Sequence, residues 1–192
     1  MEEALSSKMD IKAFIFDMDG LLFDSERIVQ RSWKMAGDEL GILHMGDVIY
    51  HTLGMNRTGR NEYFRKYIRE DFPFEEFGRL TRDNFWKIVD KEGLPLKKGV
   101  KELLAYGKAQ GYKMAVATSS SREYAMGNLI RAGIDPYFDS VICGDMVKKA
   151  KPDPEIYQKA SESLGIPPEY CMAFEDAPGG ILSAHQAGMK VI

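Results

Sequence analysis

Short apolar segments alternate with longer segments of helical character along much of the chain. The first apolar segment lies at residues 11–16, where Lys12 interrupts it. Three later segments, at residues 112–117, 140–143 and 171–174, have the same character. Short, nearly continuous apolar runs bounded by polar and turn residues are typical of strands that are buried on both faces of a parallel sheet. We therefore predict a parallel strand in each of the four segments.

The segments that connect these strands carry helix signals. We predict helices over residues 100–110, 123–132, 154–164 and 180–187. One of them begins with Pro154, directly after Asp153, whose side chain can cap the helix. A glycine stands where each helix should end, at Gly111, Gly133, Gly165 and Gly188. Strands and helices that alternate at this spacing predict a doubly wound, Rossmann-like α/β core with a parallel sheet.

The stretch from about residue 27 to about residue 94 breaks this alternation. It is rich in Arg, Glu, Tyr, Phe and Trp, and apolar side chains recur three and four residues apart, which indicates helices. We interpret it as an all-α insertion after the first strand. The predicted domains are an α/β core of residues 1–26 and 95–192 and an inserted helical domain of residues 27–94. We expect Trp33, Trp86 and the tyrosines of the insertion to pack in its core.

Charge and composition narrow the possible function classes. The chain has 192 residues and a formal net charge of -3, with charges of both signs interleaved. The longest cationic cluster, formed by Lys148, Lys149 and Lys151, is too short for a groove that binds a polyanion. We therefore predict that the protein has no nucleic-acid partner.

The ends of the chain and its cysteines bear on the compartment. The N-terminal residues are acidic and polar, and no apolar run approaches the roughly 20 residues of a spanning helix. Cys143 and Cys171 lie far apart with no Cys-x-x-Cys pair, so we interpret both as reduced core residues. We expect a cytoplasmic protein with no membrane partner. Residues 190–192 resemble the opening of another strand, so we also expect the native chain to continue beyond Ile192.

Two aspartates follow directly on the first predicted strand. Asp17 and Asp19 precede Gly20, and in open α/β sheets ligands collect at the carboxyl ends of the strands. Asp-x-Asp-Gly also occurs in turns and in calcium loops. A calcium loop requires further ligands up to a terminal Glu and has no buried strand before it, so that alternative fails here. The segment alone leaves a catalytic and a structural interpretation open.

The second strand runs into four hydroxyl residues ahead of a predicted helix. Hydroxyls and backbone amides at such a place can bind a phosphate, and Thr118 and Ser119 lie nearest to the strand. Ser120 or Ser121 could instead cap the helix.

The last two strands contribute groups of opposite charge. Lys151 lies between the third strand and a helix, and Glu175 and Asp176 follow the fourth strand. Attack of a carboxylate on a phosphate dianion requires a hard cation between the two anions, and Mg²⁺ suits a site of carboxylate oxygens. A lysine and a hydroxyl then stabilise charge on the equatorial oxygens. The set predicts a magnesium-dependent site for phosphoryl transfer.

The order Asp17-x-Asp19-Gly20, Thr118, Lys151-Pro152 and Glu175-Asp176 resembles the four motifs of the haloacid dehalogenase superfamily. Within that superfamily the chain is similar to the branch of β-phosphoglucomutase and the sugar-phosphate phosphatases. The resemblance runs from about residue 9 to the end of the chain. It implies that the helical insertion is a mobile cap that closes over a small phosphorylated metabolite, and we expect the protein to act as a monomer.

The resemblance also implies roles for the two aspartates of the first motif. Asp17 would form an aspartyl-phosphate. Asp19 would protonate the leaving oxygen and then activate the water that hydrolyses the intermediate. The dehalogenases lack this second aspartate, so Asp19 argues against halide chemistry.

The remaining motif residues would bind the phosphoryl group and the metal. Thr118 and Lys151 would hold the phosphoryl group, with Ser119 and Gly20 contributing to substrate binding. The ligands of Mg²⁺ would be these: Asp17, the backbone carbonyl of Asp19, and Asp176, with Glu175 as a direct ligand or in the outer shell.

Two cap features bear on the choice between phosphatase and mutase. The segment Gly54-Met55-Asn56-Arg57 resembles the Gly-x-x-Arg of the family, whose arginine can hold a phosphate, although Arg57 could equally be a surface ion-pair partner. Val29 stands where β-phosphoglucomutases carry a cap histidine, and no second cap lysine is evident near residues 81–84. We therefore favour a phosphomonoester hydrolase, with a phosphosugar mutase as the alternative.

A catalytically weak binding or regulatory protein on the same fold is a second alternative. The chain retains all the motif residues, although two clusters of carboxylates at one site repel each other and destabilise the fold. Because a scaffold has no need of such clusters, their retention favours an enzyme.

Overall fold

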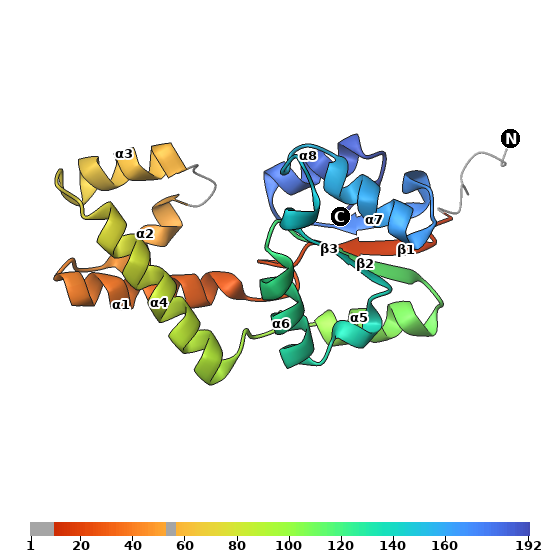
Figure 1. The fold of residues 1–192 in the computed structure, drawn as a ribbon, viewed down its shortest axis with the longest axis horizontal. Helices are drawn as coiled ribbons and strands as arrows, with labels where there is room; N and C mark the ends of the chain where they lie inside the picture. The colour runs from red at the N-terminus through yellow and green to blue at the C-terminus, as the bar shows by residue number, and fades with distance from the viewer. Residues whose placement is uncertain (1–9, 53–56) are drawn as a thin grey trace, which may run out of the picture. The chain divides into compact units, whose positions relative to one another are not determined.

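The computed structural model describes residues 10–52 and 57–192 (Figure 1). The chain divides into two compact units. One is an α/β unit, which consists of the chain up to residue 23 together with residues 95–192. The other is a helical unit of residues 24–94.

Within the described residues, the α/β unit contains a sheet of five parallel strands in the order β3-β2-β1-β4-β5. The strands are β1 (Ala13–Phe16), β2 (Lys113–Ala117), β3 (Ser140–Ile142), β4 (Cys171–Phe174) and β5 (Lys190–Val191). The four strands predicted from apolar runs are thus confirmed, and residues 190–191 form the fifth. The chain builds outward from β1 through β2 to β3 and then returns to β4, so the topological switch point lies between β1 and β4.

Helices cover both faces of this sheet. They are α5 (Val100–Ala109), α6 (Arg122–Ala132), α7 (Glu155–Leu164) and α8 (Pro178–Gln186). Figure 1 shows α5 and α6 on one face and α7 and α8 on the other, which is the doubly wound arrangement expected from the sequence. Helix α7 begins one residue later than predicted, but the Asp153 carboxylate still accepts a hydrogen bond of 3.1 Å from the Glu155 amide. Short 3₁₀ segments complete the connections: Asp135–Tyr137, Gly144–Met146 and Pro168–Tyr170.

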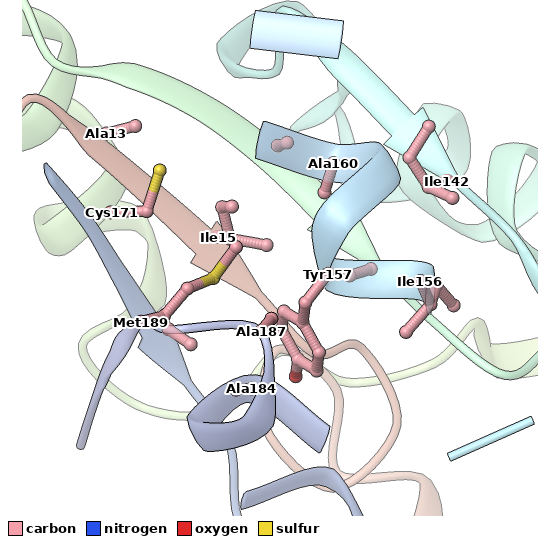
Figure 2. Close-up of a cluster of buried hydrophobic side chains, with 13 residues drawn as sticks. Ala13, Ile15, Ile142, Ile156, Tyr157, Ala160, Cys171, Ala184, Ala187 and Met189 are labelled. Atoms are coloured by element: carbon pink, nitrogen blue, oxygen red, sulfur yellow. The ribbon is translucent and has the colours of Figure 1, made fainter. Parts of the chain in front are cut away.

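Side chains that alternate along β1 belong to two different parts of the core. Ala13 and Ile15 join a buried cluster with residues of α7 and α8, and Figure 2 shows the ring of Tyr157 inside this cluster. Phe14 and Phe16 belong to an aromatic group that includes Phe174, whose ring stacks on Phe16 at 4.7 Å between centroids. The strand is therefore fixed from both faces, and its carboxyl end is held in place.

The helical unit consists, in the described residues, of α1 (Ser25–Leu40), α2 (Met45–Thr52), α3 (Arg57–Tyr67) and α4 (Phe74–Glu92). This confirms the all-α insertion after the first strand. Its core includes Trp33, as predicted. The prediction was wrong for Trp86, which is 43% exposed, and for Tyr50 and Tyr67, which are 62% and 60% exposed. Helix α4 packs through the face that carries Leu80, Asn84 and Ile88, and position 86 lies off that face.

Two further predictions concern the cysteines and the membrane. Cys143 and Cys171 are both free thiols and both buried, as expected. Among the described residues, no helix is both long enough and apolar enough to cross a membrane.

Candidate active site

The predicted acidic residues meet at the switch point of the sheet. Phe16 and Phe174 are register partners on β1 and β4, so Asp17 and Glu175 leave adjacent strands side by side. The Asp17 amide donates a 2.9 Å hydrogen bond to the Phe174 carbonyl, which extends this pairing by one residue. Both side chains are buried. The topology itself therefore places two carboxylates from distant parts of the sequence in one buried location.

Lys151 joins these two carboxylates. Its Nζ donates to Asp17 Oδ1 at 2.6 Å and to Glu175 Oε2 at 2.7 Å, and it also reaches the Ala117 carbonyl at 3.1 Å. The Lys151 side chain is only 10% exposed. A buried charge without a partner destabilises the fold. Here the positive charge of Lys151 lies against both carboxylates, so it offsets part of the repulsion between them.

Tyr157 is a part of the site that the sequence reasoning missed. Its hydroxyl donates to Glu175 Oε2 at 2.6 Å, and the Ala177 amide donates to the other oxygen, Oε1, at 3.2 Å. Burial and the Glu175 charge raise the pKa of Tyr157, so the phenol remains a donor. A tyrosine two residues into a helix carries no signal that separates it from an ordinary core residue.

The electrostatics of Asp17 differ from those of an ordinary aspartate. Burial raises the pKa of Asp17 to about 7, the positive charge of Lys151 opposes this shift, and the negative charge of Glu175 adds to it. Burial therefore destabilises the ionised form of Asp17, and a bound cation would reduce that destabilisation.

Asp19 has separate partners, both on the segment after β2. The Ser120 hydroxyl donates to Asp19 Oδ2 at 2.8 Å, and the Tyr124 hydroxyl donates to Asp19 Oδ1 at 3.2 Å. Of the two serines considered as helix caps, Ser121 is the one that caps α6, since its hydroxyl accepts from the Tyr124 amide at 3.4 Å. Sequence reasoning missed the contacts that Ser120 and Tyr124 make with Asp19.

Three acidic side chains could together hold a metal ion. Oxygen atoms of Asp17, Glu175 and Asp176 all lie within 4.8 Å of one another. The backbone at Gly20, with φ of 87°, closely approaches the Asp176 carboxylate, and a Cβ at this position would collide with that carboxylate. A donor set of oxygens alone fits a hard cation such as Mg²⁺. The Asp19 side chain is not in this cluster, so only its backbone carbonyl stays a predicted ligand.

Thr118 and Ser119 lie at the carboxyl end of β2. Thr118 is buried, its amide donates to the Ile142 carbonyl at 3.0 Å, and its hydroxyl accepts from the Ser120 amide at 3.1 Å. Ser119 is exposed, and its carbonyl closely approaches Gly144 on the neighbouring loop. The structure thus brings Thr118 to the same edge of the sheet as Asp17.

The cap residues named from the sequence are in part outside the described residues. Residues 54–56 and the side chain of Arg57 fall there, although Arg57 is the first residue of α3. The helical unit contains a cavity of about 540 Å³. It is lined by aromatic and polar side chains that include Trp33, Arg60, Asn61 and Thr81, and by Val29.

Glycine 180 allows the Glu175 carboxylate to lie against helix α8. A Cβ at Gly180 would collide with that carboxylate, whereas one at Gly179 would meet open space. We expect Gly180→Ala to lower the free energy of unfolding by about 1–3 kcal/mol, because Glu175 must leave its partners. Gly179→Ala is the matched control and should be neutral or stabilising by up to about 1 kcal/mol. Urea unfolding of both variants tests this, and equal effects would contradict it.

Comparisons with known proteins show which proteins this chain resembles. The family model of haloacid dehalogenase-like hydrolases matches residues 11–188. A phosphorylated carbohydrates phosphatase of Thermotoga maritima is 32% identical over 182 residues, which cover 95% of this chain and 84% of that protein.

Two solved structures are also similar. A HAD family hydrolase from Deinococcus radiodurans, with bound phosphate and sodium, matches with a TM-score of 0.82 and 26% identity over 95% of this chain and 80% of its own. A β-phosphoglucomutase from Clostridium difficile matches with a TM-score of 0.67 and 25% identity over 94% of this chain and 83% of its own.

Proposed function

Because this chain belongs to the haloacid dehalogenase-like hydrolases and is a phosphatase of that family, we propose that it is a magnesium-dependent hydrolase of small carbohydrate phosphates. The observation that carries the proposal is the position of Asp17. It lies at the switch point of the sheet, in contact with Lys151 and within the cluster that Glu175 and Asp176 complete.

The reaction proceeds in two steps. In the first, an Asp17 carboxylate oxygen forms a bond to phosphorus while the bond from phosphorus to the ester oxygen breaks, and Asp19 gives its proton to that leaving oxygen. In the second, water attacks the phosphorus of the aspartyl-phosphate, and ionised Asp19 takes the proton of that water. Asp17 is regenerated and inorganic phosphate leaves.

The other residues of the site bind the phosphoryl oxygens or the metal ion. Lys151 binds phosphoryl oxygens, Thr118 donates its hydroxyl to them, and Ser119 and Gly20 line the phosphate site. Asp17, Asp176 and the carbonyl of Asp19 would hold Mg²⁺, whose positive charge would offset the repulsion between the carboxylate and the phosphate dianion. Glu175 belongs in the outer shell, because both of its oxygens accept hydrogen bonds from Lys151, Tyr157 and the Ala177 amide.

The cap cavity supports a carbohydrate as the rest of the substrate. The family resemblance implies that the helical unit covers the substrate during turnover. The cavity offers an indole, a guanidinium and an amide, which together suit a ligand with many hydroxyls. Thr81 Oγ1 is buried there without a hydrogen-bond partner among the described residues, so a ligand hydroxyl could satisfy it.

One cavity residue favours hydrolysis over mutase chemistry. Val29 lines the cavity where a β-phosphoglucomutase would carry a histidine, so this position offers no group for proton transfer. We therefore propose release of inorganic phosphate as the outcome of turnover.

The proposal is tested by a panel of sugar phosphates and nucleoside monophosphates, assayed for phosphate release with Mg²⁺ and with EDTA. We expect sugar phosphates to be hydrolysed fastest and EDTA to abolish activity. Failure to hydrolyse any ester in Mg²⁺ would refute the proposal. Conversion of β-glucose 1-phosphate to the 6-phosphate without phosphate release would show a mutase instead.

Asn61→Leu tests the role of the cavity. The variant keeps the side-chain size but loses the amide, so we expect KM for the best sugar phosphate to rise about 10-fold. Its kcat/KM for p-nitrophenyl phosphate, which has no sugar hydroxyls, should change less than about twofold. Equal losses with both esters would argue against a specificity role.

A further inference from the structure

The Asp19 carboxylate is held by two donors that come from a different part of the chain. Ser120 Oγ and Tyr124 Oη each donate to a different oxygen of Asp19, at 2.8 and 3.2 Å. Asp19 itself lies on a half-buried turn that follows β1. A carboxylate bound at both oxygens has a fixed direction, which a lone aspartate on a turn would not have.

The two donors are themselves rigidly placed. Tyr124 lies in the first turn of α6, where its amide donates to the Ser121 cap and its carbonyl accepts from Asn128 Nδ2 at 2.9 Å. The Ser120 carbonyl accepts from the Gly144 amide at 2.8 Å, which ties its loop to the segment after β3. Helix α6 and two neighbouring strand ends therefore set the position of both hydroxyls.

We propose that Tyr124 and Ser120 are positioning residues for proton transfer, which direct the Asp19 carboxylate at the leaving oxygen and later at the attacking water. The inference rests on the proposed function, since it assigns a role to Asp19. General acid catalysis contributes about 10²- to 10⁴-fold when the acid is well placed, and its efficiency depends on geometry. Loss of one of the two donors should remove part of that contribution.

The test compares two leaving groups in Tyr124→Phe. A sugar alkoxide needs a proton as it leaves, whereas p-nitrophenolate does not. For the sugar phosphate that the wild type hydrolyses fastest, we expect kcat/KM to fall about 10-fold. For p-nitrophenyl phosphate it should change less than about twofold. Ser120→Ala should show the same split, and Tyr106→Phe, which loses the hydroxyl of an exposed tyrosine, should change neither value.

A double variant separates positioning from a structural role. In an Asp19→Asn background, Tyr124→Phe should have no further effect on hydrolysis of the sugar phosphate, because the group on which it acts is gone. Three outcomes would each overturn the inference: equal losses with both esters, a loss that persists in the Asp19→Asn background, or wild-type kinetics in Tyr124→Phe. A wild type that hydrolyses no ester would instead refute the proposed function.

Discussion

Asp17→Asn is expected to lower kcat/KM for every ester that the protein hydrolyses by about 10⁴- to 10⁶-fold, the range found when an enzyme loses its nucleophile. The amide retains the shape of the carboxylate but is a poor nucleophile and a weaker ligand for a cation. Phosphate release in saturating Mg²⁺ measures the effect. Asp10→Asn, the same change at a side chain that is 68% exposed, is the control and should be as active as the wild type. Comparable activity of Asp17→Asn and wild type would exclude Asp17 as the nucleophile.

The same substitution should stabilise the metal-free protein, and the effect should depend on pH. The pKa of Asp17 is about 7 in the folded protein against an ordinary value of 3.8. Below about pH 4 the carboxyl is protonated in both folded and unfolded chains. Between about pH 4 and about pH 7 the unfolded chain releases this proton while the folded protein keeps it, so this group lowers stability as pH rises. Above about pH 7 both forms are ionised, and the full cost of the buried charge remains.

Urea unfolding in EDTA at pH 5 and pH 8 tests this pH dependence. The gain in the free energy of unfolding from Asp17→Asn should be larger at pH 8 than at pH 5. An equal gain at both values would show that the burial of an ionised carboxylate is not the cause. Loss of activity together with a gain in stability would mark Asp17 as a residue kept for chemistry rather than for the fold.

The sequence was sufficient to predict the sheet because its strands are buried on both faces. Such strands are continuous apolar runs, and a polar residue directly after a run marks its carboxyl end, as Asp17 and Thr118 do. Parallel topology then brings those ends to one edge. The contact between Asp17 and Lys151, from segments 134 residues apart, follows from this logic.

The contacts of side chains within the helices could not be predicted in the same way. Tyr157 and Tyr124 both reach the site from helix positions, and their direction depends on how each helix packs on the sheet. Helical periodicity specifies which face is buried but not which buried hydroxyl meets a carboxylate. The error at Trp86 has the same origin, because an aromatic residue in an amphipathic helix lies inside only if it falls on the packed face.

Lys151→Met is expected to lower the free energy of unfolding of the metal-free protein by about 3–5 kcal/mol, because Asp17 and Glu175 would remain buried without their cation. Methionine retains most of the apolar stem, so the loss reports the charge rather than the packing. Phosphatase activity should fall as well, since Lys151 is proposed to bind the phosphoryl group. The control is Lys149→Met in the same loop, whose side chain is 73% exposed and pairs with Asp153 at 3.4 Å, and it should cost less than about 1 kcal/mol.

A second substitution distinguishes electrostatic repulsion from general disruption of the loop. Glu175→Gln keeps an oxygen that can accept the Tyr157 hydroxyl but removes one of the two negative charges. If repulsion between the carboxylates causes the loss, the double variant Lys151→Met/Glu175→Gln should be more stable than Lys151→Met alone. If the loop is simply disordered by loss of the lysine, the second substitution will not restore stability. Activity should stay low in both variants, because neutralising Glu175 relieves the repulsion without replacing the cation that Lys151 presents to a phosphate.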